Sequence, residues 1–173
     1  MAKALYFPDI LQNTNYNCGA VCVQAVLAYY GIEYTEHKLE KLLHTSKKWG
    51  TESDNIIKFF KEQGFKITSG NFSVETIKKC IHREIPVIIL IQAWAPAGTN
   101  YKHTNQYGHY VVVSGYNKRG LIIEDPAIFG RGFISYASLK KRWHSEEKEC
   151  PENFGIAVYG KKKYDYSTLY KIG

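Results

Sequence analysis

Two cysteines lie four residues apart in the stretch QNTNYNCGAVCVQAVLAYYG, which runs from Gln12 to Gly31. Cys18 stands where an apolar helical pattern begins, so its sulfur would lie over unsatisfied NH groups and the positive end of the helix dipole. This setting stabilises a thiolate, which is a competent nucleophile. Cys22 falls one turn later, within the apolar pattern, and is interpreted as a packing residue. The first chemistry to consider is therefore nucleophilic attack by Cys18.

A cysteine that attacks an amide carbonyl also needs hydrogen-bond donors for the oxyanion that forms. Gln12 precedes Cys18 by six residues and could supply a side-chain amide donor. The backbone NH of Cys18 could supply a second donor. Gly19 has no side chain, so a substrate backbone could approach it closely. We therefore predict Gln12 in the oxyanion site and Gly19 in the substrate-binding site.

A general base must take the thiol proton, and the chain has six histidines. His103 lies in a loop, whereas His109 opens an apolar strand, where rigid backbone would aim its ring. Gly108, directly before it, is predicted to border the bound substrate. His109 is thus the predicted base. The others stand among charged residues and are expected to be solvated: His37, His44, His82 and His144.

The base needs a partner that fixes its tautomer, and Asp125 ends the strand that returns toward His109. If Lys118 and Arg119 form a two-residue turn, Asp125 falls on the opposite face of the sheet from the histidine. A three-residue turn that ends with Gly120 in the left-handed conformation restores a common face. The sequence therefore predicts a bulged turn and a diagonal contact between His109 and Asp125.

The elements that position these residues divide into two halves. The first half reads as helices, of which the one over 18–30 is apolar almost all round and therefore central and buried. Gly31 suits the end of that helix. The other helices are predicted over 35–43, 51–64 and 73–82, with N-terminal caps at Thr35, Thr51 and Ser73.

The second half reads mainly as strands, which are predicted over 87–92, 109–116, 121–125, 133–136 and 155–160. A short helix is predicted over 138–143, and a long loop, Ala93–Gly108, separates the first two strands. Helices followed by antiparallel strands indicate the α+β class.

Length and composition suit one globular domain over residues 1–173. The chain has a net charge of +7, and Lys and Arg form short clusters at 140–142 and 161–163. Both clusters lie outside any nucleic-acid motif and indicate a solvated face rather than nucleic-acid binding. No signal peptide is recognisable, and the longest apolar run, 86–91, is far below the ~18 residues that span a bilayer. A cytoplasmic protein with reduced thiols and no membrane span is expected.

Four segments in order resemble the peptidase C39 family, a branch of the papain-like cysteine peptidases: Gln12, NCG around Cys18, GHYVVVSGY around His109 and IIEDP around Asp125. The similarity extends from about residue 9 to about residue 136. It implies that these residues are, in order, the oxyanion-hole residue, the nucleophile, the base and the orienting acid. It also implies a papain-like fold, in which the helix with the nucleophile packs against an antiparallel sheet.

The best-known members of that family are N-terminal domains of ABC exporters, which cut leader peptides after a Gly-Gly or Gly-Ala pair. This sequence contains neither a membrane span nor a nucleotide-binding motif, so the resemblance is either to a stand-alone member or to a peptidase domain from which the rest of a longer protein has been cut away. It implies a peptide or protein substrate, cleavage after small residues, no cofactor, and an association with an exporter.

Three other readings of the residues remain open. The same triad serves deamidases and other amide acyl transferases, which differ in pocket and acceptor rather than in motif. A groove rich in tyrosine would also suit a non-catalytic peptide-binding module. A metal site that uses Cys18, Cys22 and a histidine is a third reading, but the chain lacks the paired ligand clusters of a structural zinc site, and no metal is predicted.

Overall fold

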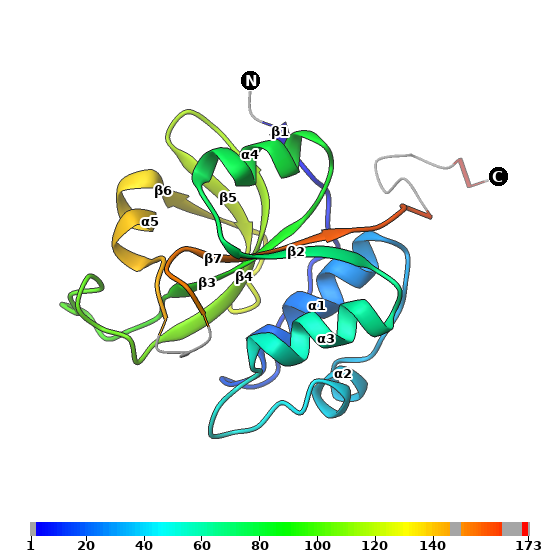
Figure 1. Cartoon of the computed structure of the whole chain (residues 1–173), viewed down its shortest axis with the longest axis horizontal. Coiled ribbons are helices and arrows are strands. Elements are labelled where there is room, and N and C mark those ends of the chain that lie inside the picture. The colour runs from blue at the N-terminus through cyan, green and yellow to red at the C-terminus, as the bar shows by residue number, and fades with distance from the viewer. Residues whose placement is uncertain (1–2, 146–149, 164–170, 173) are drawn as a thin grey trace.

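The computed structural model describes residues 3–145, 150–163 and 171–172. A single antiparallel sheet joins its strands in the order β2-β7-β3-β4-β5-β6, and β1 pairs with the end of β4 (Figure 1). The predicted α+β class is confirmed. The helices are α1 (Cys18–Tyr29), α2 (Glu36–Leu42), α3 (Ser53–Glu62), α4 (Val74–His82) and α5 (Tyr136–Arg142). The strands are β1 (Lys3–Ala4), β2 (Lys66–Asn71), β3 (Val87–Gln92), β4 (Gly108–Tyr116), β5 (Gly120–Glu124), β6 (Arg131–Ser135) and β7 (Phe154–Tyr159).

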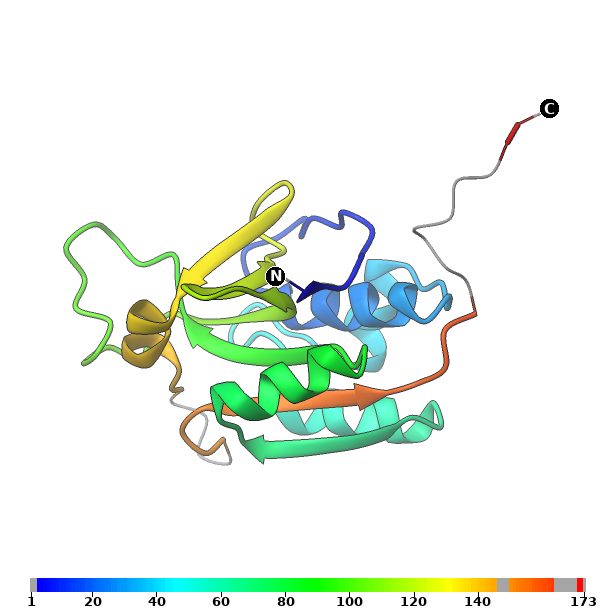
Figure 2. The same cartoon turned by 90° about the horizontal axis from the view of Figure 1, so that it is seen from above.

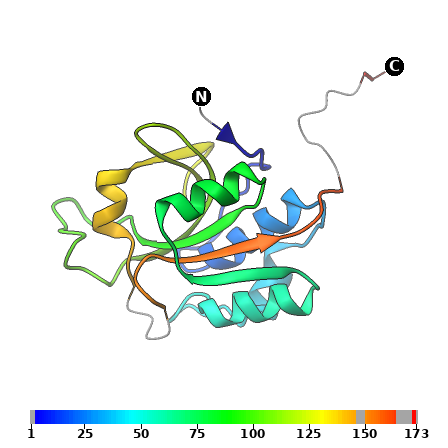
Figure 3. The same ribbon diagram turned by 45° about the horizontal axis from the view of Figure 1, so that its top comes forward.

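The sheet separates two groups of helices. α1, α2 and α3 lie together on one side, and α4 lies on the other (Figures 1 and 2). In Figure 3, β7 (orange) crosses in front of α1 (blue), and β2 lies between β7 and α3. α1 contacts β4 as well as α2 and α3, so it occupies the centre of the molecule.

α1 is apolar on nearly every face because nearly every face is covered. Only Gln24 and Ala28 of this helix are partly exposed, and the rest are buried. The chain leaves the helix at Gly31, whose φ of 78° is the left-handed conformation that glycine adopts without strain. The predicted central helix and its end are confirmed.

The division into a helical half and a sheet half needs a correction. β2 lies in the first half of the chain and forms an edge of the sheet beside β7, and β1 also joins the sheet, at the end of β4. Neither strand was predicted. The sequence of β2, KITSGN, is mostly polar and includes a glycine, because an edge strand that is largely exposed needs little apolar character.

Two of the predicted helix caps are confirmed, and one is wrong. Thr35 and Ser73 accept hydrogen bonds from the NH groups three residues later, at the starts of α2 and α4. Thr51 does not cap α3, because its hydroxyl pairs with that of Thr45 at 2.7 Å and the N-cap position falls on Glu52. α5 begins two residues earlier than predicted, with Ser135 as its cap.

The pairing of β4 with β5 contains one extra residue. Val113 lies opposite Ile123, whereas Gly115 lies opposite Ile122, so Ser114 is a bulge in β4. The predicted place of the bulge, at the turn, is therefore wrong. The turn is tight: the side-chain oxygen of Asn117 accepts hydrogen bonds from the NH of Arg119, which precedes β5, and from the NH of Gly120, which begins it.

The bulge has the effect that was expected of it. Continuing the register beyond the pair of Val112 and Glu124 sets Asp125 opposite Val111. Since alternate residues of a strand share a face, Asp125 and His109 lie on one face, offset by two residues along β4. The predicted diagonal arrangement is confirmed. Without Ser114 the two side chains would lie on opposite faces.

Gly120 tests how tightly β5 is held against β6. A Cβ atom at this position would lie 2.1 Å from the carbonyl oxygen of Ile134, which is backbone and cannot move aside. We expect Gly120→Ala to lower the free energy of unfolding by about 2–3 kcal/mol in urea titrations. Gly108→Ala is the control, because its Cβ would meet only Leu90 at an ordinary 3.8 Å. Equal effects of the two substitutions would contradict this account.

Candidate active site

Cys18 is the first residue of α1, as predicted, and only 8% of its surface is exposed. Asn17 occupies the N-cap position but makes no side-chain cap, and the first turn of the helix contains no acidic residue. The first-turn NH groups are therefore left for other partners. This end of α1 can accommodate negative charge on a sulfur or on a substrate oxygen.

His109 and Asp125 form a buried pair. The Nε2–H of His109 donates to Oδ1 of Asp125 at 2.6 Å, and both side chains are less than one-tenth exposed. Asp125 thereby holds the imidazole in one tautomer and one orientation, which leaves Nδ1 for another partner. The structure brings these two predicted residues together.

The other partner of the imidazole is the Cys18 thiol. Burial by itself would lower the pKa of His109, but hydrogen bonds with Asp125 and with Cys18 outweigh burial and raise the pKa from 6.5 to about 9. A histidine that stays protonated at neutral pH can stand beside a thiolate as an ion pair. Cys18, His109 and Asp125 therefore form one connected row.

Asp125 is held by more than the histidine. Its Oδ1 also accepts from the NH of Ala127 at 2.9 Å, and its Oδ2 accepts from the indole Nε1 of Trp94 at 3.1 Å. Burial would raise the pKa of Asp125, but the hydrogen bond with His109 outweighs it, with help from Ala127 and Trp94, and the pKa falls below its ordinary 3.8. The acid therefore stays ionised beside the imidazolium.

Trp94 is the residue of this site that the sequence analysis missed. It follows β3 by two residues, in the long loop, and no motif marks it. The only signal was its chemistry, since a Trp near a strand end can donate one hydrogen bond to a buried carboxylate. Its contact with Asp125 is made across 31 residues of sequence, which no local pattern reveals.

Gln12 lies beside the turn that follows Asp125. Its backbone NH donates to the carbonyl oxygen of Pro126 at 2.9 Å, and its side-chain oxygen is buried without a hydrogen-bond partner in the described part of the chain. This contact ties the segment before Cys18 to the strand end that supplies the acid. The role of Gln12 in an oxyanion site stays a prediction.

Two asparagines anchor the same segment to α2. The side chain of Asn17 donates to Glu36 and, at 2.7 Å, to Glu40, while Asn13 donates to Glu36 through both its backbone NH and its side chain. Asn17 is fully buried, directly before the nucleophile. The loop from Gln12 to Cys18 is thus held on two sides, by the turn that follows Asp125 and by α2.

The two predicted substrate-binding glycines differ in what surrounds them. A Cβ at Gly19 would lie 2.7 Å from Cβ of Thr51 and 3.1 Å from the ring of Tyr110, so this glycine is needed for close packing of α1. Gly108 is exposed and has space around it, directly before His109. Their contact with a substrate stays a prediction.

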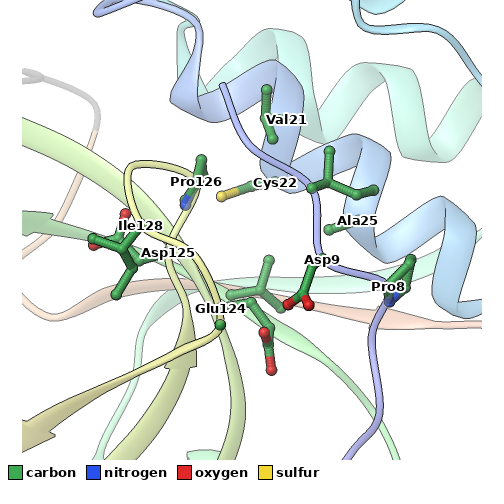
Figure 4. Close-up of a pocket in the computed structure, with 12 residues that line it drawn as sticks. Pro8, Asp9, Val21, Cys22, Ala25, Glu124, Asp125, Pro126 and Ile128 are labelled. Atoms are coloured by element: carbon green, nitrogen blue, oxygen red, sulfur yellow. The ribbon is translucent and has the colours of Figure 1, made fainter. Parts of the chain in front are cut away.

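Cys22 lies in a different environment from Cys18. It is 1% exposed and lines a small pocket with Val21 and Ala25, in which its sulfur points toward Pro126 (Figure 4). Burial raises the pKa of the Cys22 thiol well above its ordinary value, and Cys18 and Asp125 raise it further. The interpretation of Cys22 as a packing residue is confirmed.

One of the other histidines departs from the expectation of a solvated ring. Both ring nitrogens of His144 have protein partners: Nδ1 pairs with the side-chain oxygen of Asn105, and Nε2 pairs with the carbonyl oxygen of Tyr101, each at 2.7 Å. The flanking charges suggested a solvated side chain, but this histidine holds the long loop against the end of α5.

The described residues contain neither a candidate metal site nor a candidate membrane span. No group of three or more His, Cys, Asp or Glu side chains among them could hold a metal ion. No helix in that part of the chain has the length and apolar character needed to cross a membrane.

Comparison with known proteins identifies the family of this site. The model of the Peptidase C39 family matches residues 7–147, which is most of the chain and includes all four predicted catalytic positions. The chain belongs to the peptidase C39 family. The resemblance seen in the sequence is thereby confirmed, and the chain is a cysteine peptidase.

One curated relative is the lactococcin-G-processing and transport ATP-binding protein LagD of Lactococcus lactis subsp. lactis. It is 27% identical over 157 residues, which cover 91% of this C39 chain. The chain spans only 19% of the length of that relative.

Solved structures share the fold. A C39-like peptidase from Bacillus anthracis superimposes with a TM-score of 0.72 at 16% identity, covering 94% of this chain and all of the other. The double glycine motif protease of an AMS/PCAT transporter, solved with the leader peptide, gives 0.65 at 21% identity, covering 90% and 93%. The peptidase domain of Streptococcus ComA gives 0.65 at 22% identity, covering 89% and 97%. The predicted papain-like fold, in which the helix that begins at Cys18 packs against an antiparallel sheet, is therefore confirmed.

The raised pKa of His109 predicts how the free energy of unfolding depends on pH. Because the folded state holds this proton more tightly than the unfolded chain, the stabilisation is fully present below pH 6.5 and is lost as the pH rises through about 9. Urea titrations of the wild type at pH 6, 7.5 and 9.5 should show a loss of up to about 3 kcal/mol relative to His109→Gln. Parallel profiles for the two proteins would contradict the raised pKa.

Proposed function

We propose that this chain hydrolyses peptide bonds with Cys18 as nucleophile, His109 as general acid and base, Asp125 as the orienting acid and Gln12 as an oxyanion donor. The observation that supports the proposal best is the continuous row of hydrogen bonds from Asp125 through His109 to Cys18. A buried carboxylate, an imidazole with a raised pKa and a thiol at a helix start are the three parts that activate a cysteine.

In the acylation step the Cys18 thiolate attacks the carbonyl carbon of the scissile peptide bond. The carbonyl oxygen becomes negative and accepts hydrogen bonds from the Cys18 NH and the Gln12 amide. The imidazolium of His109 donates its Nδ1 proton to the leaving amine, the carbon–nitrogen bond breaks, and a thioester remains on Cys18. Asp125 keeps the ring in place throughout, through the 2.6 Å bond to Nε2.

In the deacylation step the now neutral His109 removes a proton from water. The water oxygen attacks the thioester, the carbon–sulfur bond breaks, and the carboxylic acid product leaves with Cys18 again a thiolate beside the imidazolium. The protons balance, because the one given to the amine is replaced by one from water.

For the substrate we propose a peptide with a pair of small residues, of the Gly-Gly type, before the scissile bond. The support is similarity: one relative is a processing and transport protein, and one solved structure is a double glycine motif protease bound to a leader peptide. An association with an exporter, on the cytoplasmic side, would follow from the same likeness. A mixture of synthetic peptides with central Gly-Gly or Val-Val pairs tests this specificity by mass spectrometry.

The first prediction of the mechanism concerns the reactivity of Cys18. We expect iodoacetamide to alkylate one thiol fast at neutral pH, and peptide mapping to place the label on Cys18. His109→Ala should slow this labelling by about 10²-fold, because the proton acceptor is lost.

Cys150 provides the matched control for that experiment, because it is more exposed than Cys18. If exposure alone set the rate, Cys150 would react first, and Cys150→Ser would abolish the fast phase. Under the proposed mechanism Cys150→Ser leaves the fast phase unchanged and Cys18→Ala removes it. Adding an amine donor to the cleavage assay separates hydrolysis from acyl transfer, since transfer adds the mass of the amine.

Gln12→Ala tests the oxyanion role separately. We expect kcat for peptide cleavage to fall about 10²–10³-fold, because one donor to the developing oxyanion is lost. Alkylation of Cys18 should keep its rate, because attack on iodoacetamide places no negative charge on a carbonyl oxygen. Equal losses in both assays would show that Gln12 maintains the structure of the site rather than stabilising the oxyanion.

A further inference from the structure

A pocket opens on the face of the sheet that holds His109 and Asp125. Its floor consists of Ile91, Ile123 and Ile134, and Asp125 itself lines it. Ile91 is the cross-strand partner of His109, and Ile123 precedes Asp125 by two residues on the same face. Since adjacent strands lie about 5 Å apart, the pocket begins one strand away from the imidazole.

The walls of this pocket come from the long loop and from α5. Trp94 and Tyr101 supply aromatic rings from the loop, and Arg142 supplies a guanidinium from the last turn of α5. The indole of Trp94 is 59% exposed although its Nε1 is bound to Asp125, so most of its surface is left for a ligand. The loop and α5 lie side by side in both views (Figures 1 and 2).

Arg142 is oriented by neutral groups, and none of its contacts in the described part of the chain is with a carboxylate. Its Nε donates to the hydroxyl of Ser138 at 2.9 Å, one Nη donates to the carbonyl oxygen of Gln92 at 3.3 Å, and the guanidinium lies 3.5 Å from the ring centre of Tyr101. Three of its five N–H groups have no partner in the described part of the chain, and no described carboxylate forms an ion pair with it. Such a cation is ready to bind an anionic group.

The loop that forms the wall is fixed before any ligand binds. The NH of Ala95 donates to the hydroxyl of Tyr101 at 3.0 Å, and His144 holds the carbonyl oxygen of Tyr101 from the other side. Tyr101 therefore links the aromatic wall to the end of α5. A pocket that is already shaped loses little conformational entropy on binding.

We propose that this pocket binds the part of the substrate that follows the scissile bond, and that Arg142 selects a carboxylate there, next to an apolar side chain. The proposal rests on the proposed peptidase function. His109 must protonate the leaving amine, so the leaving segment lies on the side of His109, where the pocket begins. At about 3.3 Å per extended residue, the second residue after the bond lies beyond the spacing of one strand and therefore within the pocket that Arg142 lines. The carboxylate belongs either to an Asp or Glu side chain or to the end of the chain.

The test measures binding of leaving segments, so it does not depend on cleavage. Three tripeptides serve as probes: Gly-Leu-Glu-amide, Gly-Leu-Gln-amide and Gly-Leu-Gln with a free carboxylate. Each is titrated into the ¹⁵N-labelled full chain while the indole NH signal of Trp94 is followed by NMR. We expect at least one carboxylate peptide to bind about tenfold more tightly than the neutral amide. Which of the two does so identifies the source of the carboxylate.

Variants of Arg142 decide the assignment. Arg142→Gln should remove the preference for a carboxylate, and Arg142→Lys should keep part of it, because the charge remains although the stacking on Tyr101 is lost. The matched control is Arg83→Gln, which removes an exposed arginine at the end of α4 and should change nothing. Equal binding of all three peptides, or a preference that survives in Arg142→Gln, would overturn the proposal. A chain that binds these tripeptides but cleaves none of the longer synthetic peptides with central Gly-Gly or Val-Val pairs would refute the peptidase function and leave the carboxylate site at Arg142 standing.

Discussion

The hydrogen bond between His109 and Asp125 depends on a single extra residue, Ser114 in β4. The turn between β4 and β5 is tight, and a regular pairing from that turn would set the two side chains on opposite faces of the sheet. The bulge shifts the pairing by one residue before the strands reach the site. The NH of Leu5, directly after β1, donates to the carbonyl oxygen of Ser114, so the bulge is also held from outside. A defect in a strand thus makes the acid–base pair geometrically possible.

The nucleophile is placed by a separate constraint. Tyr110 of β4 packs against Gly19, and Val112 lines the same pocket as Val21 and Cys22, so these alternate positions of β4 face α1. His109 alternates with them and projects from the other face. Only a residue at the very start of α1, near the start of β4, can reach it, and Cys18 is that residue. The close packing at Gly19 brings the start of α1 against β4. A glycine is therefore needed at this position for packing, in addition to any access it gives to a substrate.

Much of this arrangement could be predicted from the sequence, because it depends on the local spacing of apolar and polar residues along the chain. Periodicity predicts the apolar helix that begins at Cys18 and the strand opened by His109. The alternation of side chains between the two faces of a strand predicts that a bulge is needed before Asp125. The position of the bulge could not be predicted. Gly120 suits a bulged turn as well as Ser114 suits an irregular strand, and the contact that holds the bulge at Ser114 comes from Leu5, more than a hundred residues away. Likewise β2 has no apolar pattern, because its stability comes from pairing with β7 at the other end of the chain.

Trp94 shows why the long loop was the part least open to prediction. Its φ of 60° is a left-handed conformation that a bulky residue rarely adopts, at a cost of about 1–3 kcal/mol. The surrounding bonds offset that cost: the indole binds Asp125, and the next NH, that of Ala95, binds Tyr101. The conformation therefore exists only when loop, acid and α5 are all in place. Asp125 receives donors from His109, Ala127 and Trp94, so a displacement of Trp94 removes one of these three donors from the acid. Trp94 therefore couples the two: it lines the pocket for the leaving segment, and it binds the carboxylate that orients the base.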